Sequence, residues 1–183
     1  MAGTDLTFRR AGPGDIPAIQ QLVTVAYRGD QSRQGWTTEA DILDGQRIDS
    51  ATLRDEMLRG DRLRDDSAVL LAETHGALVG CAHIAHDGAG TGYFGMFAVR
   101  PGQQGGGIGK QILAEAERRA VDDWAVTSMQ MTVISVREEL AAFYERRGYR
   151  RTGQFKPFPY GDERFGVPKR DDLRFEVLEK PLR

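Results

Sequence analysis

The chain has 183 residues, 40% hydrophobic and 28% charged, which is the length and composition of one globular domain with a buried core. Basic and acidic residues number 25 and 27, and this near balance argues against a general nucleic-acid binder, which normally shows a basic excess. Cys81 is the only cysteine, which excludes an intramolecular disulfide and a cysteine-based zinc site, and we predict no metal site.

The first 60 residues read as a short strand followed by helices. Residues 6–10 form the expected strand, and Asp15 is typical of a helix N-cap. Apolar residues at helical spacing carry this first helix to about Tyr27. Ser50 is the expected cap of a second helix, which stops at Gly60.

The rest of the chain alternates strands with two further helices. In chain order we expect strands at 68–74, 77–86 and 91–99, a helix that begins near Ile108, a strand at 129–134, a helix at 138–147, and strands at 149–155 and 172–178. This order predicts a single α/β domain over residues 1–183, with a mixed sheet and helices packed on it.

A glycine-dense loop is the sharpest chemical feature. Residues 99–110 read VRPGQQGGGIGK between a strand and a helix, where backbone N–H groups and the helix dipole favour a phosphate. A Walker A loop does not fit, because Gln104 replaces its first glycine and Gln111 its Ser or Thr. The Rossmann pattern fails as well, since Ile112 stands where a third small residue belongs.

Two segments resemble one family. The pattern Gln104-x-x-Gly107-x-Gly109 resembles the acetyl-CoA pyrophosphate loop of the GCN5-related N-acetyltransferases (GNATs). The stretch LAAFYERRGY at 140–149 resembles the family's second signature, a short helix with an aromatic pair that ends at a glycine. The resemblance spans roughly residues 68–155. It implies the GNAT fold, an α/β (α+β) arrangement whose mixed, mostly antiparallel central sheet has six to seven strands with helices on both faces.

The resemblance also implies an activity and a site. The expected reaction is direct transfer of an acetyl group from acetyl-CoA, the acyl donor, to a primary amine within a ternary complex. Tyr144 matches the family tyrosine that lies near the thioester sulfur, and we expect it to protonate the departing thiolate. The residues expected to bind the donor are Phe97, Ala98, Val99, Gln104, Gly105, Gly106, Gly107, Ile108, Gly109, Lys110, Arg137 and Phe143.

Two departures from the family pattern concern the site. Arg137 stands where the family often has an asparagine, seven positions before the tyrosine. The stretch 95–99 contains no carboxylate, although many members place a glutamate general base there. The candidate bases are therefore Glu73, His83, His86 and Glu39, and we carry Glu39 forward as a catalytic candidate. Core packing alone would also account for a phenylalanine at 143, and the favourable interaction of an acid with a helix N-terminus would account for a glutamate at 39.

The acceptor is not specified by these residues. Residues 27–45 and the loop 158–166 are its expected walls, and the loop mixes aromatic with acidic residues. That mixture suits a small cationic amine, but equally a solvated hairpin or a dimer contact, so a homodimer stays open. An amino-acid derivative and a peptide or protein amine are further candidates.

Two other functions are alternatives to the enzyme: a non-catalytic acyl-CoA-binding module, and a nucleotide-phosphate binder that uses the glycine loop differently. Nucleic-acid and membrane partners are not expected. The N-terminus shows no signal-peptide pattern, and no stretch approaches the roughly 20 apolar residues of a membrane span, so we expect a soluble, cytoplasmic protein.

Overall fold

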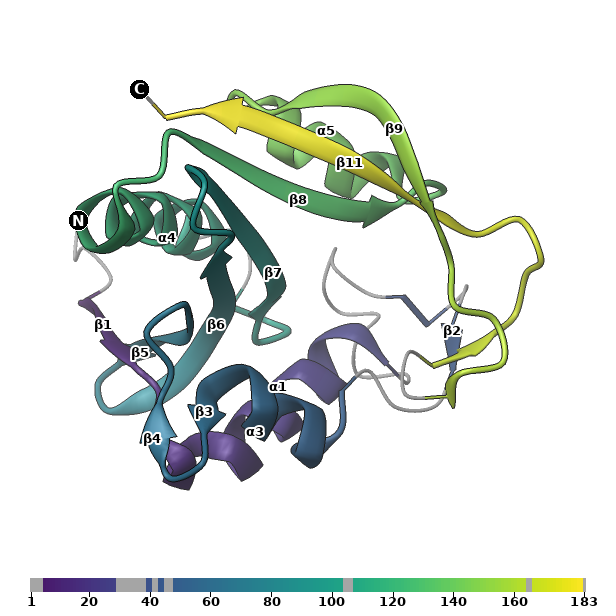
Figure 1. Cartoon of the computed structure of the whole chain (residues 1–183). Helices are drawn as coiled ribbons and strands as arrows, with labels where there is room; N and C mark the ends of the chain where they lie inside the picture. The colour runs from purple at the N-terminus through teal and green to yellow at the C-terminus, as the bar shows by residue number, and fades with distance from the viewer. Residues whose placement is uncertain are drawn as a thin grey trace.

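Seven strands form one sheet in the computed structural model, which describes residues 5–28, 39–40, 43–44, 48–103, 107–163 and 166–182. The strands are β1 (Leu6–Arg10), β5 (Ser67–Thr74), β6 (Ala77–His86), β7 (Thr91–Val99), β8 (Ser128–Ile134), β9 (Arg150–Pro157) and β11 (Arg174–Pro181). Their order across the sheet is β1-β5-β6-β7-β8-β11-β9, and every neighbouring pair is antiparallel except β7 with β8 (Figure 1).

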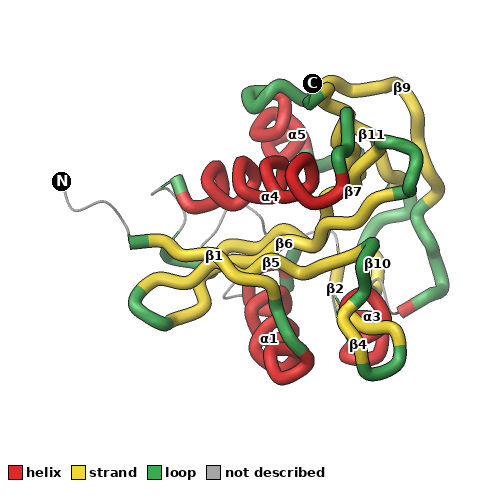
Figure 2. Tube along the Cα trace, turned by 60° about the vertical axis from the view of Figure 1, so that its left-hand side comes forward, coloured by secondary structure: helices red, strands yellow, loops and turns green. Residues whose placement is uncertain are grey.

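Helices cover both faces of this sheet. They are α1 (Ile16–Tyr27), α3 (Ser50–Met57), α4 (Ile108–Trp124) and α5 (Glu138–Glu145), and a 3₁₀ turn at Pro13–Asp15 leads into α1. Figure 2 shows α1 and α3 on one side of β5 and β6, and α4 on the other. Alternation along β5 serves both cores, because Leu70 packs in the cluster with α4 while Leu71 packs in the cluster with α1 and α3.

Two short strand pairs lie outside the main sheet. β3 (Leu58–Arg59) pairs with β4 (Arg62–Leu63), and β2 (Leu43–Asp44) pairs with β10 (Val167–Pro168). The second pair joins two distant segments, and the Lys169 ammonium adds a hydrogen bond of 2.6 Å to the carbonyl of Ala40. The pair therefore joins the expected acceptor wall 27–45 to the residues that directly follow the other expected wall, 158–166.

The predicted elements are all present, with one correction at a helix start. Asp49, and not Ser50, is the N-cap of α3, because its carboxylate accepts the backbone N–H of Thr52 at 2.7 Å. The Ser50 hydroxyl instead donates to the side-chain oxygen of Gln20 at 2.7 Å. The helix ends at Met57, before Gly60, because the chain extends into β3 there. The predicted fold class, a mixed and mostly antiparallel sheet covered by helices, is confirmed.

The parallel strands β7 and β8 meet at one end only. They pair over Thr91–Tyr93 and Ser128–Gln130, and from there the two ribbons diverge (Figure 1). On its other side β7 is bulged against β6, where the register shifts between Cys81 and His83 and Met96 has a φ of 46°. A positive φ is uncommon for a residue with a side chain, so we treat the bulge as a specific structural feature of β7.

None of the helices in the described ranges is long and apolar enough to cross a membrane.

Candidate active site

A cavity of about 470 Å³ lies where β7 and β8 diverge. Both strands line it, with Phe94 to Phe97 on β7 and Met131 to Ile134 on β8. The remaining described lining residues come from the end of α1, from β2 and the residues before it, from α5 with its N-cap, and from the late part of the chain. They are Tyr27, Arg28, Glu39, Leu43, Arg137, Leu140, Tyr144, Lys156, Pro157, Phe158, Pro159 and Phe175. The site is thus assembled from segments spread over most of the sequence.

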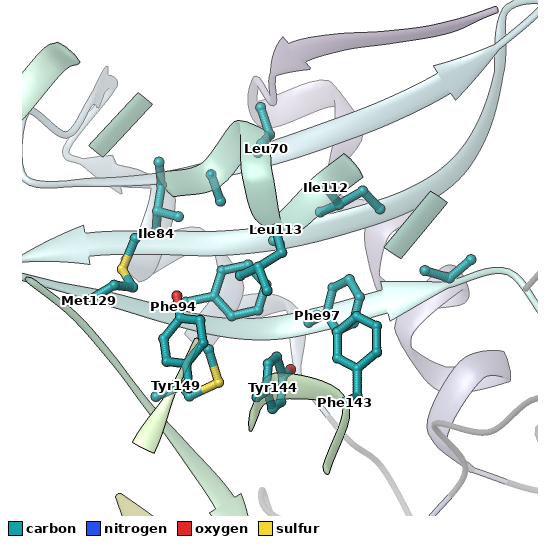
Figure 3. Packing of buried hydrophobic residues seen from close by; sticks show 14 of the residues in the cluster. Leu70, Ile84, Phe94, Phe97, Ile112, Leu113, Met129, Phe143, Tyr144 and Tyr149 are labelled. Atoms are coloured by element: carbon teal, nitrogen blue, oxygen red, sulfur yellow. The ribbon is translucent and has the colours of Figure 1, made fainter. Parts of the chain in front are cut away.

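Tyr144 lies on the cavity wall within a group of aromatic rings. Its side chain comes from α5, is 4% exposed, and makes edge contacts with Phe143 and Tyr149, whose ring centroids lie 5.3 and 6.0 Å away (Figure 3). Phe143 instead stacks on Phe97, at 6.0 Å between centroids, and is not among the lining residues. Of the aromatic pair in this helix, Tyr144 faces the cavity and Phe143 packs in the core.

The end of the glycine loop leads directly into α4. Gly107 is the N-cap of this helix and has a φ of 77°, a conformation in which a side chain would be strained. A Cβ on Gly109 would lie 2.9 Å from Cζ of Phe97, so this glycine allows the first turn of α4 to pack closely on β7. Ile108 is buried and Lys110 is exposed, whereas Gln104, Gly105 and Gly106 lie outside the described residues.

One edge of β7 pairs with β6, and its other edge faces the gap with β8. Val99 is opposite Gly80 in the ladder, and the N–H of Arg100 donates to the carbonyl of Val79 at 2.8 Å. Residue pairs of an antiparallel ladder alternate between bonded and non-bonded pairs, so the N–H of Val99 points away from β6. Ala98, which we expected to bind the donor, is buried in the hydrophobic cluster that includes residues of α1.

A buried ion cluster lies on one part of the cavity wall. One oxygen of Glu39 accepts from the guanidinium of Arg28, and the other accepts from that of Arg137 at 3.1 Å. The side chains of Arg28, Glu39 and Arg137 are 3%, 5% and 9% exposed. The Arg137 guanidinium also lies 5.6 Å from the ring centroid of Tyr27, whose hydroxyl donates to the carbonyl of Phe97. This chain of contacts connects α1, the bulge of β7 and the start of α5.

Of the four candidate bases, only Glu39 lines the cavity. Glu73, on β5, accepts a hydrogen bond of 2.9 Å from the guanidinium of Arg9, and the ring of His86 packs at a tilt against Trp124 with centroids 4.7 Å apart. His83 Nε2 lies 2.6 Å from the hydroxyl of Ser67, and burial lowers the pKa of this histidine to about 4.

Sequence reasoning missed several residues of the cavity. Phe94 and Lys156 line it outside the expected walls, and Arg28 lies within the expected wall 27–45 but was not singled out, because none of the three belongs to a motif that could have marked it. Arg28 reads as the polar end of an amphipathic helix, and Lys156 as one of several cations on a strand. They are brought to one site by the fold, so only their positions in space reveal them.

Comparison with known proteins identifies the family. Residues 65–151 match the family model described as an acetyltransferase (GNAT) domain. The chain belongs to the GNAT superfamily through this domain. The matched stretch runs from just before β5 to the start of β9, and so includes the divergence of β7 and β8, the whole of α4 and Tyr144.

Solved structures of low sequence identity share the GNAT fold. A ribosomal-protein-alanine N-acetyltransferase from Brucella melitensis is 21% identical with a TM-score of 0.68, covering 96% of this chain and 99% of that one. The ribosomal-protein-S18-alanine N-acetyltransferase from Escherichia coli is 15% identical with a TM-score of 0.66, covering 97% and 94%. An IAA acetyltransferase from Bacillus cereus is 17% identical, with a TM-score of 0.64 and coverage of 97% and 99%. No curated protein matches the sequence.

Proposed function

We propose that this GNAT protein transfers an acetyl group from acetyl-CoA to a primary amine. The observation that carries the proposal is the cavity between the diverging β7 and β8, with Tyr144 on its wall and α4 as the next helix after β7. The gap between the two strands suits the slender acyl-carrying arm of the donor. The N-terminus of α4, at Gly107, suits its pyrophosphate.

In the proposed reaction the donor supplies an acetyl thioester, and the residues of this chain orient and polarise it. The N–H of Val99 donates to the thioester carbonyl oxygen and stabilises the negative charge that develops there. The amine nitrogen forms the new C–N bond as the C–S bond breaks. The hydroxyl of Tyr144 then gives a proton to the departing thiolate, and the proton released by the acetylated nitrogen restores the hydroxyl. Phe97 and Phe143 support the site by packing under α4.

The attacking amine must lose a proton, and Glu39 is the only carboxylate among the described lining residues. Both of its oxygens are engaged by guanidinium groups. This pairing makes Glu39 the common partner of two arginines, so we favour proton loss to water and a positioning role for Glu39. A pH–rate profile of the Glu39→Gln variant distinguishes these two roles. If Glu39 is the base, the variant loses the fall in rate at low pH. If Glu39 only positions other groups, the variant is slower but its rate still falls at low pH.

Two of the similar structures are named as ribosomal-protein-alanine N-acetyltransferases, which supports a peptide or protein amine as one candidate acceptor. A small amine and an amino-acid derivative are the others, because a cavity of about 470 Å³ admits a small ligand.

The first experiment is a thermal-shift titration with acetyl-CoA, CoA, ATP and NAD side by side. A ligand that binds only the folded protein raises its stability by mass action. We expect stabilisation by acetyl-CoA and CoA alone, followed by release of thiol when amines are added. A larger shift with ATP or NAD would contradict the proposal. Binding of CoA with no turnover of any amine would favour a non-catalytic acyl-CoA-binding module.

A further inference from the structure

Four lysines supply all the side-chain primary amines of the chain, and the structure describes each of them: Lys110, Lys156, Lys169 and Lys180. Of the four, only Lys156 lines the cavity between β7 and β8. Lys169 donates to a backbone carbonyl, and Lys180 donates to the carboxylate of Glu117. Lys156 is exposed and makes no such contact with a described residue, so its amine is available for reaction.

The register of the sheet turns the side chain of Lys156 toward the cavity. Lys156 on β9 is opposite Phe175 on β11, and Phe175 is opposite Ile134 on β8, in three strands that lie side by side (Figure 1). Directly opposed residues place their side chains on the same face of a sheet, and all three of these residues line the cavity. The neighbouring Phe155 points to the other face, where the guanidinium of Arg174 lies 3.6 Å from its ring centroid.

Lys156 and Tyr144 reach the cavity from opposite faces of the sheet. On β8, Val133 packs in the hydrophobic cluster that contains Tyr144. Ile134, the next residue, packs in the cluster that contains Phe158, because successive side chains of a strand point to opposite faces. Lys156 shares the face of Ile134. An acyl group held between β7 and β8 would therefore have Tyr144 on one side and the Lys156 amine on the other.

The lysine side chain is long enough to reach such an acyl group. A compact cavity of about 470 Å³ is roughly 10 Å across. From Cα to Nζ a lysine has five bonds of about 1.5 Å, and the extended side chain covers roughly 6 Å. Its four-carbon stem is flexible. The amine of Lys156 can therefore approach a group near the centre of the cavity.

We propose that Lys156 is a site of self-acetylation, to which the protein transfers the acetyl group of bound acetyl-CoA. This rests on the proposed acetyl transfer and adds an acceptor within the chain. Water takes one proton from the Lys156 ammonium, and the neutral nitrogen attacks the carbonyl carbon of the thioester. The C–N bond forms, the C–S bond breaks, and Tyr144 protonates the thiolate. The second proton lost by the nitrogen restores the Tyr144 hydroxyl, which leaves acetylated Lys156 and free CoA.

The test measures acetylation of the whole chain by saturating acetyl-CoA with no added amine. Digestion and mass spectrometry give a rate for each of the four lysines in one sample. We expect Lys156 to react at least about 10-fold faster than Lys110, which is also exposed but lies outside the cavity, because the thioester is held beside Lys156. The rate constant should stay the same over a roughly 20-fold range of protein concentration, as an intramolecular step requires. An excess of free CoA should slow the reaction of Lys156 but not that of Lys110.

Two matched variants locate the site. Lys156→Arg keeps the positive charge but has no amine to acetylate, so it should lose the fast addition of one acetyl group. Lys180→Arg removes a lysine outside the cavity, and an arginine can still pair with Glu117. This control should be acetylated at Lys156 as quickly as the wild type. Should either variant fail to fold, the four rates in the wild type decide.

The possible results separate this inference from the proposed function. Absence of stabilisation by acetyl-CoA contradicts acetyl transfer, and self-acetylation with it. If acetyl-CoA stabilises the protein but Lys156 reacts no faster than Lys110, self-acetylation is wrong, and acetylation of added amines would still support the proposed function. A rate constant that rises with protein concentration overturns the inference, because one molecule would then modify another. Equally fast reaction of Lys156 in urea-unfolded protein overturns it as well.

Discussion

Gly109 and Phe97 are in such close contact that a Cβ on the glycine would lie 2.9 Å from Cζ of the ring. Phe97 is 2% exposed and stacks on Phe143, so its ring has little room to move. The glycine that resembles part of a phosphate loop therefore also serves packing, since it sets how closely α4 approaches β7.

The first prediction concerns this contact. Gly109→Ala should lower the free energy of unfolding by about 1–2 kcal/mol, because overpacking in a tight core outweighs the roughly 1 kcal/mol by which alanine favours a helix. It should also weaken binding of acetyl-CoA, since α4 must shift. Urea unfolding and a thermal-shift titration measure the two effects. Gly14→Ala is the control, because a Cβ there has no atom within 4 Å, and it should change stability by less than about 0.5 kcal/mol.

The second prediction concerns Tyr144. Tyr144→Phe retains the ring contacts with Phe143 and Tyr149 but removes the hydroxyl. If this hydroxyl protonates the thiolate, kcat should fall by roughly 10²–10⁴-fold, the usual contribution of a general acid, while the affinity for CoA stays the same. Steady-state kinetics and calorimetric titration with CoA check this. Unchanged turnover would remove Tyr144 from the mechanism without affecting the family assignment.

The third prediction concerns His83 and acid. Burial, with a smaller contribution from Arg64, lowers the pKa of His83 to about 4 from an ordinary value near 6.5. The unfolded chain therefore binds a proton at a higher pH than the folded protein does, and stability falls as the pH drops from about 6.5 to 4. The full difference corresponds to roughly 3 kcal/mol. The carboxylate of Glu56 lies 3.8 Å from the ring nitrogen Nδ1 and is too distant for a strong hydrogen bond.

His83→Gln tests this directly, since glutamine can still bond to Ser67 but does not titrate. Urea unfolding at pH 7, 5.5 and 4 should show a loss of stability in the wild type that is smaller in the variant. Parallel curves for the two proteins would mean that the carboxylates, and not His83, cause the acid sensitivity.

The fourth prediction concerns the cap of α3. Asp49→Ala should cost about 1 kcal/mol, because it removes the acceptor for the N–H of Thr52 and for the Thr52 hydroxyl at 2.9 Å. Ser50→Ala should cost less than about 0.5 kcal/mol, because its exposed hydroxyl bonds only to Gln20 among the described partners. Thermal unfolding of both variants ranks them. The opposite order would restore Ser50 as the cap.

Several features were predictable from sequence because they depend on local patterns. The helical spacing of apolar residues in α1 and the apolar run in β5 follow from which residues face a core, so both elements appear at nearly the expected bounds. The glycine run before Ile108 and the aromatic pair before Gly148 are also local. Together they indicated the family that the match over residues 65–151 identifies.

The tertiary structure alone decided how distant residues meet. Arg28, Glu39 and Arg137 form one cluster across as many as 109 positions of the chain, and no local pattern encodes such a contact. The place of β9 beside β11, and not beside β8, likewise depends on how the last strand enters the sheet. The cavity exists because β7 and β8 pair for only three residues and then part. Sequence periodicity specifies which side of a strand is buried, but long-range packing specifies which strands meet and where they separate.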